Sequence, residues 1–242
     1  VIVSPEGKLG VSARKLNRLT KGAIHRFIQS DNFKNFKPSN IISLAWPSGL
    51  IASSLDIVCL PRDHSVAQAR NAGAALAKLR GKECILLALD GVRRADEIAF
   101  GLAMRDYRFI DHKTDAVLND GAVTVMCTNP KIVEAAYAPL LAVIEGTFLT
   151  RDLVNEPANV LTTNNFANRL EEMSALGLKV EVLDEKELEQ LGMRTLLCVG
   201  QGSESPSKVV IMKWDGDQQN ITPFALVGKG VVFDTGGISL KP

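Results

Sequence analysis

Apolar residues in the first 130 positions follow two alternating patterns. Short, solid or period-two apolar runs, typical of strands, occur at 40–46, 55–61, 83–90 and 122–128. Between them, apolar positions recur at helical spacing over 65–80 and 94–109, and near the start a helix capped by Ser12 is predicted to carry Leu16, Leu19, Ala23 and Phe27 on one face. This alternation predicts a layered α/β domain with a largely parallel sheet.

A long helical stretch follows, at about 131–154. Pro139 and Gly146 lie inside it and could kink or break it. It ends at "NEPAN" (155–159), where Pro157 disfavours helical backbone at the preceding residue. We therefore predict a domain over 1–150 that includes this linking helix, and a hinge followed by a second domain over 151–242.

The pattern restarts in the second part of the chain. Helices are predicted at 162–176 and 185–192, and strands at 178–184, 195–203, 208–216 and 221–230. No helix follows the last strand, although a parallel sheet needs cover on both faces. We therefore expect this domain to continue in sequence beyond residue 242.

Composition narrows the class of protein. Hydrophobic residues make up 46% of the 242 positions, which is enough for a folded core, and the net charge of +1 gives no sign of a nucleic-acid surface. The chain has four cysteines, each within an apolar run: Cys59, Cys84, Cys127 and Cys198. This placement predicts buried free thiols in a reducing compartment. No signal-peptide pattern or apolar run of about 18 residues is evident, so we expect a cytoplasmic protein without a membrane partner.

Candidate chemistry is concentrated in "VGKGVVFDTGGISLKP" (227–242). Taken singly, Lys229, Asp234 and Lys241 would be ordinary solvated residues. Together they flank an apolar strand, and Asp234 lies between that strand and a Gly–Gly pair, a position where sites form in α/β sheets. Nucleotide-binding and serine-hydrolase motifs are absent, and the three histidines are scattered, which suggests surface or packing roles for His25, His64 and His112.

This stretch resembles the signature of the leucyl aminopeptidase (cytosol aminopeptidase) family. Further similarity lies in "RDLVNEPANVLTTNNFA" (151–167), "LGMRTLLCVGQGS" (191–203) and "YRFIDHKT" (107–114), and is strongest after residue 151. Val232 and Thr235 stand where the family often has Thr and Ser, and neither change removes a charged residue. The resemblance implies an amino-terminal macro-like α/β domain followed by the start of an α/β zinc-peptidase-type catalytic domain.

The resemblance also implies a chemistry. Two divalent metal ions per subunit, Mn²⁺ or Zn²⁺ with Mg²⁺ possible, would be bound in part by the neutral amine of Lys229 and by the carboxylate of Asp234. Lys241 would be a catalytic cation beside the reacting carbonyl. The enzyme would release amino-terminal residues, leucine and other large apolar ones preferred, from peptides, and would form a homo-hexamer. The family's other ligands and a catalytic arginine are expected downstream, so the 242-residue chain alone is expected to be inactive.

One alternative stays open at this point. If the gene ends at residue 242, the better hypothesis is a non-catalytic α/β module for binding or assembly. The discriminating observation is whether the reading frame continues into an acidic motif.

Overall fold

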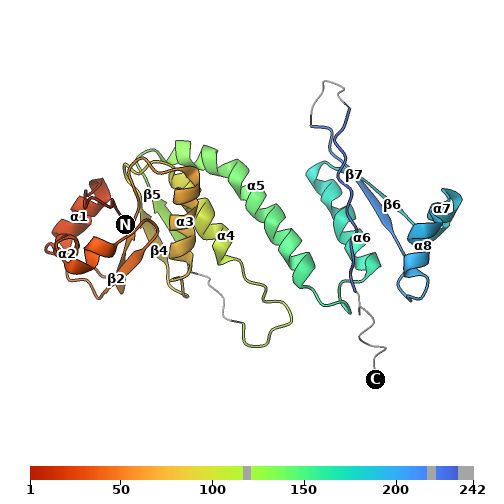
Figure 1. The fold of residues 1–242 in the computed structure, drawn as a ribbon, viewed down its shortest axis with the longest axis horizontal. Coiled ribbons are helices and arrows are strands. Elements are labelled where there is room, and N and C mark those ends of the chain that lie inside the picture. Colours follow the sequence, from red (N-terminus) through yellow and green to blue (C-terminus); the bar gives the residue numbers. More distant parts are fainter. Residues whose placement is uncertain (117–120, 217–221, 234–242) are drawn as a thin grey trace. The chain divides into compact units, whose positions relative to one another are not determined.

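The computed structural model describes residues 1–116, 121–216 and 222–233, which form two compact units, Val1–Thr150 and Arg151–Pro242 (Figure 1). The division between the units falls inside the longest helix, α5 (Pro130–Asn155). Each unit is described by itself below.

The strands of the first unit form two small sheets. β1 (Ile2–Val3), β3 (Ser54–Cys59) and β2 (Ile41–Ala45) lie in that order, with β1 parallel and β2 antiparallel to β3. β4 (Ile85–Ala88) and β5 (Val123–Met126) form a parallel pair. The predicted largely parallel sheet is therefore wrong for β2, because the short connection from β2 to β3 permits only an antiparallel hairpin.

Helices cover both faces of β3. On one face α1 (Val11–Leu19), α2 (Ala23–Ile28) and the 3₁₀ turn η1 (Asp31–Asn35) enclose a cluster of Val3, Ile24, Phe27, Leu55 and Ile57. A single helix was expected here, but left-handed Gly22 (φ 84°) separates α1 from α2. Ser12 lies inside α1, not at its cap; its hydroxyl donates to the carboxylate of Asp90 across the fold (3.3 Å).

On the other face, α3 (Val66–Ala77) and α4 (Ala95–Asp106) pack together (Figure 1). Ser65 and Gln68 form a reciprocal capping box that begins α3. The buried cluster on this side joins both helices to β3 and β4, with members that include Val58, Leu76, Leu87, Ile98 and Leu102. Its position between helices and strands confirms the predicted α/β layering.

Helix α5 continues through Pro139 and Gly146 as one helix of 26 residues. Of the helices in the described ranges, it alone has the length and apolar composition that a membrane span would need. Most of its residues are exposed, but Ile144 is buried and Phe148 contacts the ring of Tyr107 (centroids 5.0 Å apart).

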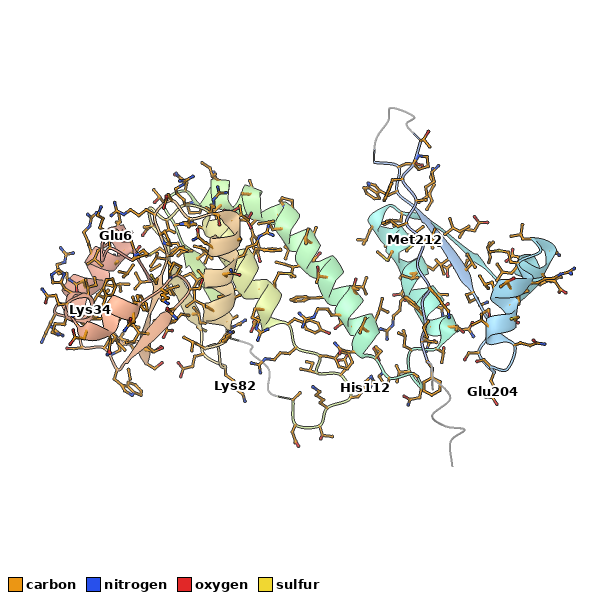
Figure 2. All side chains as sticks on the ribbon, in the orientation of Figure 1. Glu6, Lys34, Lys82, His112, Glu204 and Met212 are labelled. Atoms are coloured by element: carbon orange, nitrogen blue, oxygen red, sulfur yellow. The ribbon has the colours of Figure 1, made fainter. Side chains whose placement is uncertain are left out.

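The second unit begins with α6 (Thr163–Glu171) and η2 (Glu172–Leu176), followed by β6 (Lys179–Leu183) and α7 (Glu185–Gln190). After these come α8 (Arg194–Gly200) and β7 (Val209–Lys213), which pairs antiparallel with β6. Met212 lies on β7, and Glu204 lies in the connection that precedes it (Figure 2).

Two strand predictions in this unit are wrong. The predicted strand at 195–203 begins as helix α8, because a short apolar run does not distinguish a strand from a helix turn. The predicted strand at 221–230 is not paired in the described residues 222–230, which have no regular secondary structure.

Candidate functional site

Of the three predicted site residues, the structure describes Lys229; Asp234 and Lys241 lie outside the described residues. Lys229 belongs to the segment 222–233, and its side chain is exposed. Its neighbour Gly230 lies so close to α6 that an added Cβ would be 2.7 Å from Cε1 of Phe166. The structure thus places Gly230, the residue after Lys229, against Phe166 of the 151–167 segment, the other stretch in which the family resemblance is strong.

Helix α6 is fixed locally by its own amino-terminal turn. The Thr162 hydroxyl accepts from the Asn165 backbone N–H (3.3 Å), and the Asn165 side-chain amide donates to the Val160 carbonyl (2.6 Å). Ala167, next to Phe166, is buried. These hydrogen bonds fix the start of α6, the helix whose Phe166 side chain lies against Gly230.

The "NEPAN" turn is tied to α6 by an ion pair. Arg169 donates to the carboxylate of Glu156 at 2.7 Å, and the Glu156 side chain is only 5% exposed. A buried carboxylate without a cation would be costly, so this pair fixes the turn relative to α6. The family resemblance included this turn, but only the structure shows that Arg169, thirteen residues further along the chain, pairs with Glu156.

The described residues do not by themselves supply a metal site. Within 1–116, 121–216 and 222–233, no group of three or more His, Cys, Asp or Glu side chains could hold an ion. A neutral lysine amine can bind Zn²⁺ or Mn²⁺, but one donor does not make a site. Lys229 therefore fits the predicted ligand set only as one member of it.

The histidines have the surface and packing roles that their scatter predicted. His25 and His112 are exposed, whereas His64 is buried. The two ring nitrogens of His64 lie 2.7 Å from the Pro61 carbonyl and 2.9 Å from the Arg93 carbonyl. His64 thus links the connection before α3 to the connection before α4.

All four cysteines are free thiols, as predicted, but only Cys59 is buried. Its thiol is fully buried and donates to the Phe36 carbonyl (3.3 Å), and burial, with a smaller effect of Glu6, raises its pKa to about 11. Cys84 and Cys198 are exposed and Cys127 is half-buried. Cys84 precedes the first residue of β4, and Cys198 lies on a helix where a buried strand was expected.

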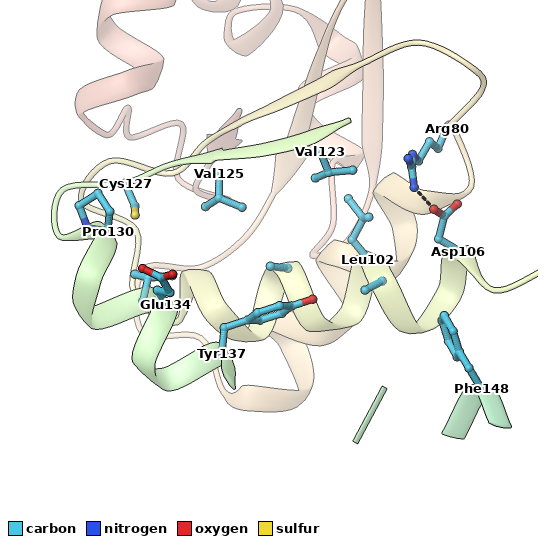
Figure 3. A pocket seen from close by; sticks show the side chains of 13 residues that line it. Arg80, Leu102, Asp106, Val123, Val125, Cys127, Pro130, Glu134, Tyr137 and Phe148 are labelled. Carbon is cyan, nitrogen blue, oxygen red and sulfur yellow. Dashed lines mark ion pairs between the residues drawn. The ribbon is translucent and has the colours of Figure 1, made fainter. Parts of the chain in front are cut away.

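The first unit contains a separate pocket of about 650 Å³ between α4, β5 and α5 (Figure 3). Its floor is apolar, with Leu102, Val123 and Val125 among the lining residues. Cys127 and Glu134 lie at one end, near Pro130, and the Arg80–Asp106 ion pair lies at the other. Tyr137 lies between these ends, and burial raises the pKa of its hydroxyl. No sequence motif had indicated this pocket.

Comparison with known proteins identifies the same family that the sequence motifs resemble. Residues 148–242 match the cytosol aminopeptidase family, catalytic domain. The whole chain is 52% identical over 242 residues to a probable cytosol aminopeptidase of Dinoroseobacter shibae, and 49% identical to one of Cereibacter sphaeroides, covering 49% and 50% of those proteins. The chain therefore spans about half the length of the curated relatives it matches.

Solved structures agree on the fold. A mutant of tomato leucine aminopeptidase is similar over 98% of this chain and 52% of its own, with a TM-score of 0.78 at 19% identity, which bears on the fold alone. The bottromycin maturation enzyme BotP, solved in complex with Mn, is similar over 88% of this chain and 44% of its own, with a TM-score of 0.64 at 26% identity. These similarities confirm the predicted α/β fold class.

Proposed function

This chain belongs to the cytosol aminopeptidase family, and we propose that it forms the first part of a metal-dependent aminopeptidase. Residues 1–150 would be the macro-like amino-terminal domain, including the linking helix at about 131–154, and residues 151–242 the hinge and the beginning of the catalytic domain. The observation that carries the proposal is the match of 148–242 to the family's catalytic domain, the part of the chain that contains all three candidate site residues.

In this proposal Lys229 and Asp234 hold divalent metal, and Lys241 acts on the substrate. The metal ions, Mn²⁺ or Zn²⁺ with Mg²⁺ possible, would activate water and polarise the scissile carbonyl. The Mn complex of a similar protein supports a divalent metal. Lys229 must be neutral to donate its amine nitrogen, whereas Lys241 must remain an ammonium to stabilise the negative charge that develops on the carbonyl oxygen.

The remaining parts of the proposal concern the whole protein. Further carboxylate ligands and a catalytic arginine would come from sequence that this chain does not contain, so the chain alone would be inactive. Peptides with a free amino terminus would be the substrates, with leucine and other large apolar residues preferred. The relatives' name, cytosol aminopeptidase, supports a cytoplasmic location. A homo-hexamer, without nucleic-acid or membrane partners, is the expected assembly.

The test is a fusion of this chain to the part of the Dinoroseobacter shibae relative that its alignment leaves uncovered. We expect the fusion to hydrolyse leucine p-nitroanilide but not the N-acetylated compound, to lose activity to a chelator, and to regain it with Mn²⁺ or Zn²⁺. Full activity after metal removal, verified by elemental analysis, would refute the mechanism.

Lys229→Arg in the fusion tests the ligand assignment, because a guanidinium cannot give up its proton to bind a metal. We expect loss of one metal ion per subunit and at least about 100-fold lower kcat, whereas Asp234→Asn should lower metal content as well. Lys186→Arg is the matched control, since Lys186 is an exposed residue of α7. Equal metal content in both lysine variants would remove Lys229 from the ligand set.

The alternative function, a non-catalytic binding or assembly module, is favoured by one observation, the pocket between α4, β5 and α5. Its volume lies within the range of small-molecule sites, and its apolar floor has polar groups at both ends. Under this alternative, a small apolar ligand should protect the amides of β5 from hydrogen exchange, and Val125→Asp should abolish that protection.

A further inference from the structure

The pocket between α4, β5 and α5 takes no part in the proposed peptidase chemistry. All its lining residues lie in the first unit, between positions 80 and 148, whereas Lys229, Asp234 and Lys241 belong to the second unit's sequence. Its volume of about 650 Å³ lies within the usual range of small-molecule sites, about 300–1,000 Å³. The pocket is therefore a candidate ligand site that does not depend on the peptidase proposal.

Small side chains on α4 leave this space open. Ala99 and Ala103 lie one helical turn apart and both line the pocket, where larger side chains would fill it. Val123 and Val125 also line it, two residues apart and therefore on the same face of β5. Buried Leu102 completes the apolar floor. Because apolar surface gains free energy when it leaves water, these walls favour a ligand with an apolar body.

The charged groups at one end of the pocket compensate each other. Arg80 and Asp106 form an ion pair there, and their side chains are only 9% and 15% exposed (Figure 3). The Arg80 guanidinium also donates to the Gly121 carbonyl. This end of the pocket therefore offers no net charge to a ligand.

The other end carries a carboxylate that no described cation neutralises. Glu134 lies near Pro130 and Cys127, is exposed, and forms no ion pair with the described residues (Figure 3). Tyr137, one turn further along α5, lies between the two ends, and its hydroxyl makes no hydrogen bond to another described residue. Burial raises the pKa of this hydroxyl, so it stays neutral and can donate or accept. The pocket thus presents one negative group and one neutral polar group.

We propose that this pocket binds a small molecule with an apolar body and a single ammonium group. The body covers the floor formed by Leu102, Val123 and Val125, and the ammonium lies beside the Glu134 carboxylate. An anion is disfavoured, because Glu134 repels it and the charge of Arg80 is already compensated. Short peptides with a free, apolar amino-terminal residue and non-peptide amines share this chemistry.

The test compares phenylbutylamine, phenylbutanol and phenylbutyrate, which have similar shapes and different charges. Each is titrated by calorimetry at low salt into the fusion after chelation, so that the amine cannot bind metal in the proposed catalytic site. We expect the amine to bind about three- to fivefold tighter than the alcohol, the increment of a solvent-exposed ion pair, and the acid to bind more weakly than the alcohol. Equal affinities, or no binding of the amine, would overturn the proposal.

A fourth probe, leucyl-leucinamide, distinguishes the sources of the ligand. Binding of this dipeptide amide would identify peptides as the source, whereas binding of phenylbutylamine alone would identify non-peptide amines; both results support the site. Aminopeptidase activity of the metal-loaded fusion tests the proposed function separately, so either proposal can fail while the other stands.

Cys127 reports where the probe binds. Saturating phenylbutylamine should slow alkylation of Cys127 by iodoacetamide at least about threefold and leave the exposed Cys84 unchanged. Absence of this protection would place the probe elsewhere and overturn the proposal.

Substitutions separate the contribution of charge from that of shape. Glu134→Gln should remove the preference for the amine over the alcohol, whereas Glu145→Gln should retain it, because Glu145 is an exposed carboxylate of α5 outside the pocket lining. Ala103→Leu should fill the space and weaken binding of both probes by about tenfold or more. An amine preference that survives Glu134→Gln would refute the assignment.

Discussion

Helices α3 and α4 cross at two glycines, and this crossing allows the sharpest test of the fold. A Cβ added at Gly73 would lie 1.9 Å from the Ile98 carbonyl oxygen, and one at Gly101 would lie 2.0 Å from the Arg70 carbonyl oxygen. Both obstacles are backbone atoms of the opposite helix, which cannot rotate away as a side chain could. Gly73→Ala therefore requires the two helices to separate.

The size of the effect follows from two opposing contributions. Contacts below 3.0 Å are essentially never seen for a real Cβ, so the helices must move apart by more than about 1 Å. A gap of that size forfeits a quarter to a half of the dispersion energy of each contact between the helices, and overpacking of this kind costs about 1–3 kcal/mol, occasionally more. Replacing a helical glycine by alanine returns about 1 kcal/mol. Because the obstacles at Gly73 are backbone atoms, the cost lies at the upper end of this range, about 3 kcal/mol, so we expect a net destabilisation of about 2 kcal/mol.

For a unit of 150 residues this corresponds to a fall in Tm of about 4–8 °C, measured by circular dichroism, with hydrogen exchange to localise the loss to α3 and α4. Gly146→Ala in α5 is the matched control, because an added Cβ there meets nothing within 4 Å. It should stabilise the protein by about 0.5–1 kcal/mol. Equal effects of the two substitutions would refute the close crossing of α3 and α4.

Three further predictions concern single side chains. His64→Leu should destabilise the first unit by about 1–2 kcal/mol in urea unfolding, because the buried ring loses its contacts with the carbonyls of Pro61 and Arg93. A change below about 0.5 kcal/mol would contradict this. At pH 8.5 iodoacetamide should alkylate the exposed Cys84 far faster than Cys59, because the Cys59 thiol is buried and has a pKa of about 11. Equal labelling of the two cysteines, measured by mass spectrometry, would argue against the burial of Cys59. Arg169→Met should lower the free energy of unfolding by about 1–3 kcal/mol, because the buried Glu156 carboxylate loses this cation. Lys34→Met breaks an exposed ion pair and should lower the free energy of unfolding by less than about 0.5 kcal/mol. Similar losses in the two variants would contradict the difference in burial.

The sequence by itself determined the elements that local chemistry specifies. The apolar period predicted most helices and strands of the first unit, and the helix predicted at 65–80 begins in the structure at the Ser65–Gln68 capping box of α3. The motif around Lys229 indicated the family, which the comparisons support. These features depend on residues close together in the chain, so their signal is present without the fold.

The tertiary structure decided the features that depend on distant residues. The antiparallel pairing of β2, the contact of Ser12 with Asp90 and the crossing at Gly73 each join segments that no local pattern connects. Residues 195–200 are helical although their apolar run equally suits a strand, because a short apolar run does not by itself fix the backbone conformation. Segment 222–233 shows the converse: its sequence favours a strand, but a strand needs a neighbour for its hydrogen bonds, and no described segment provides one.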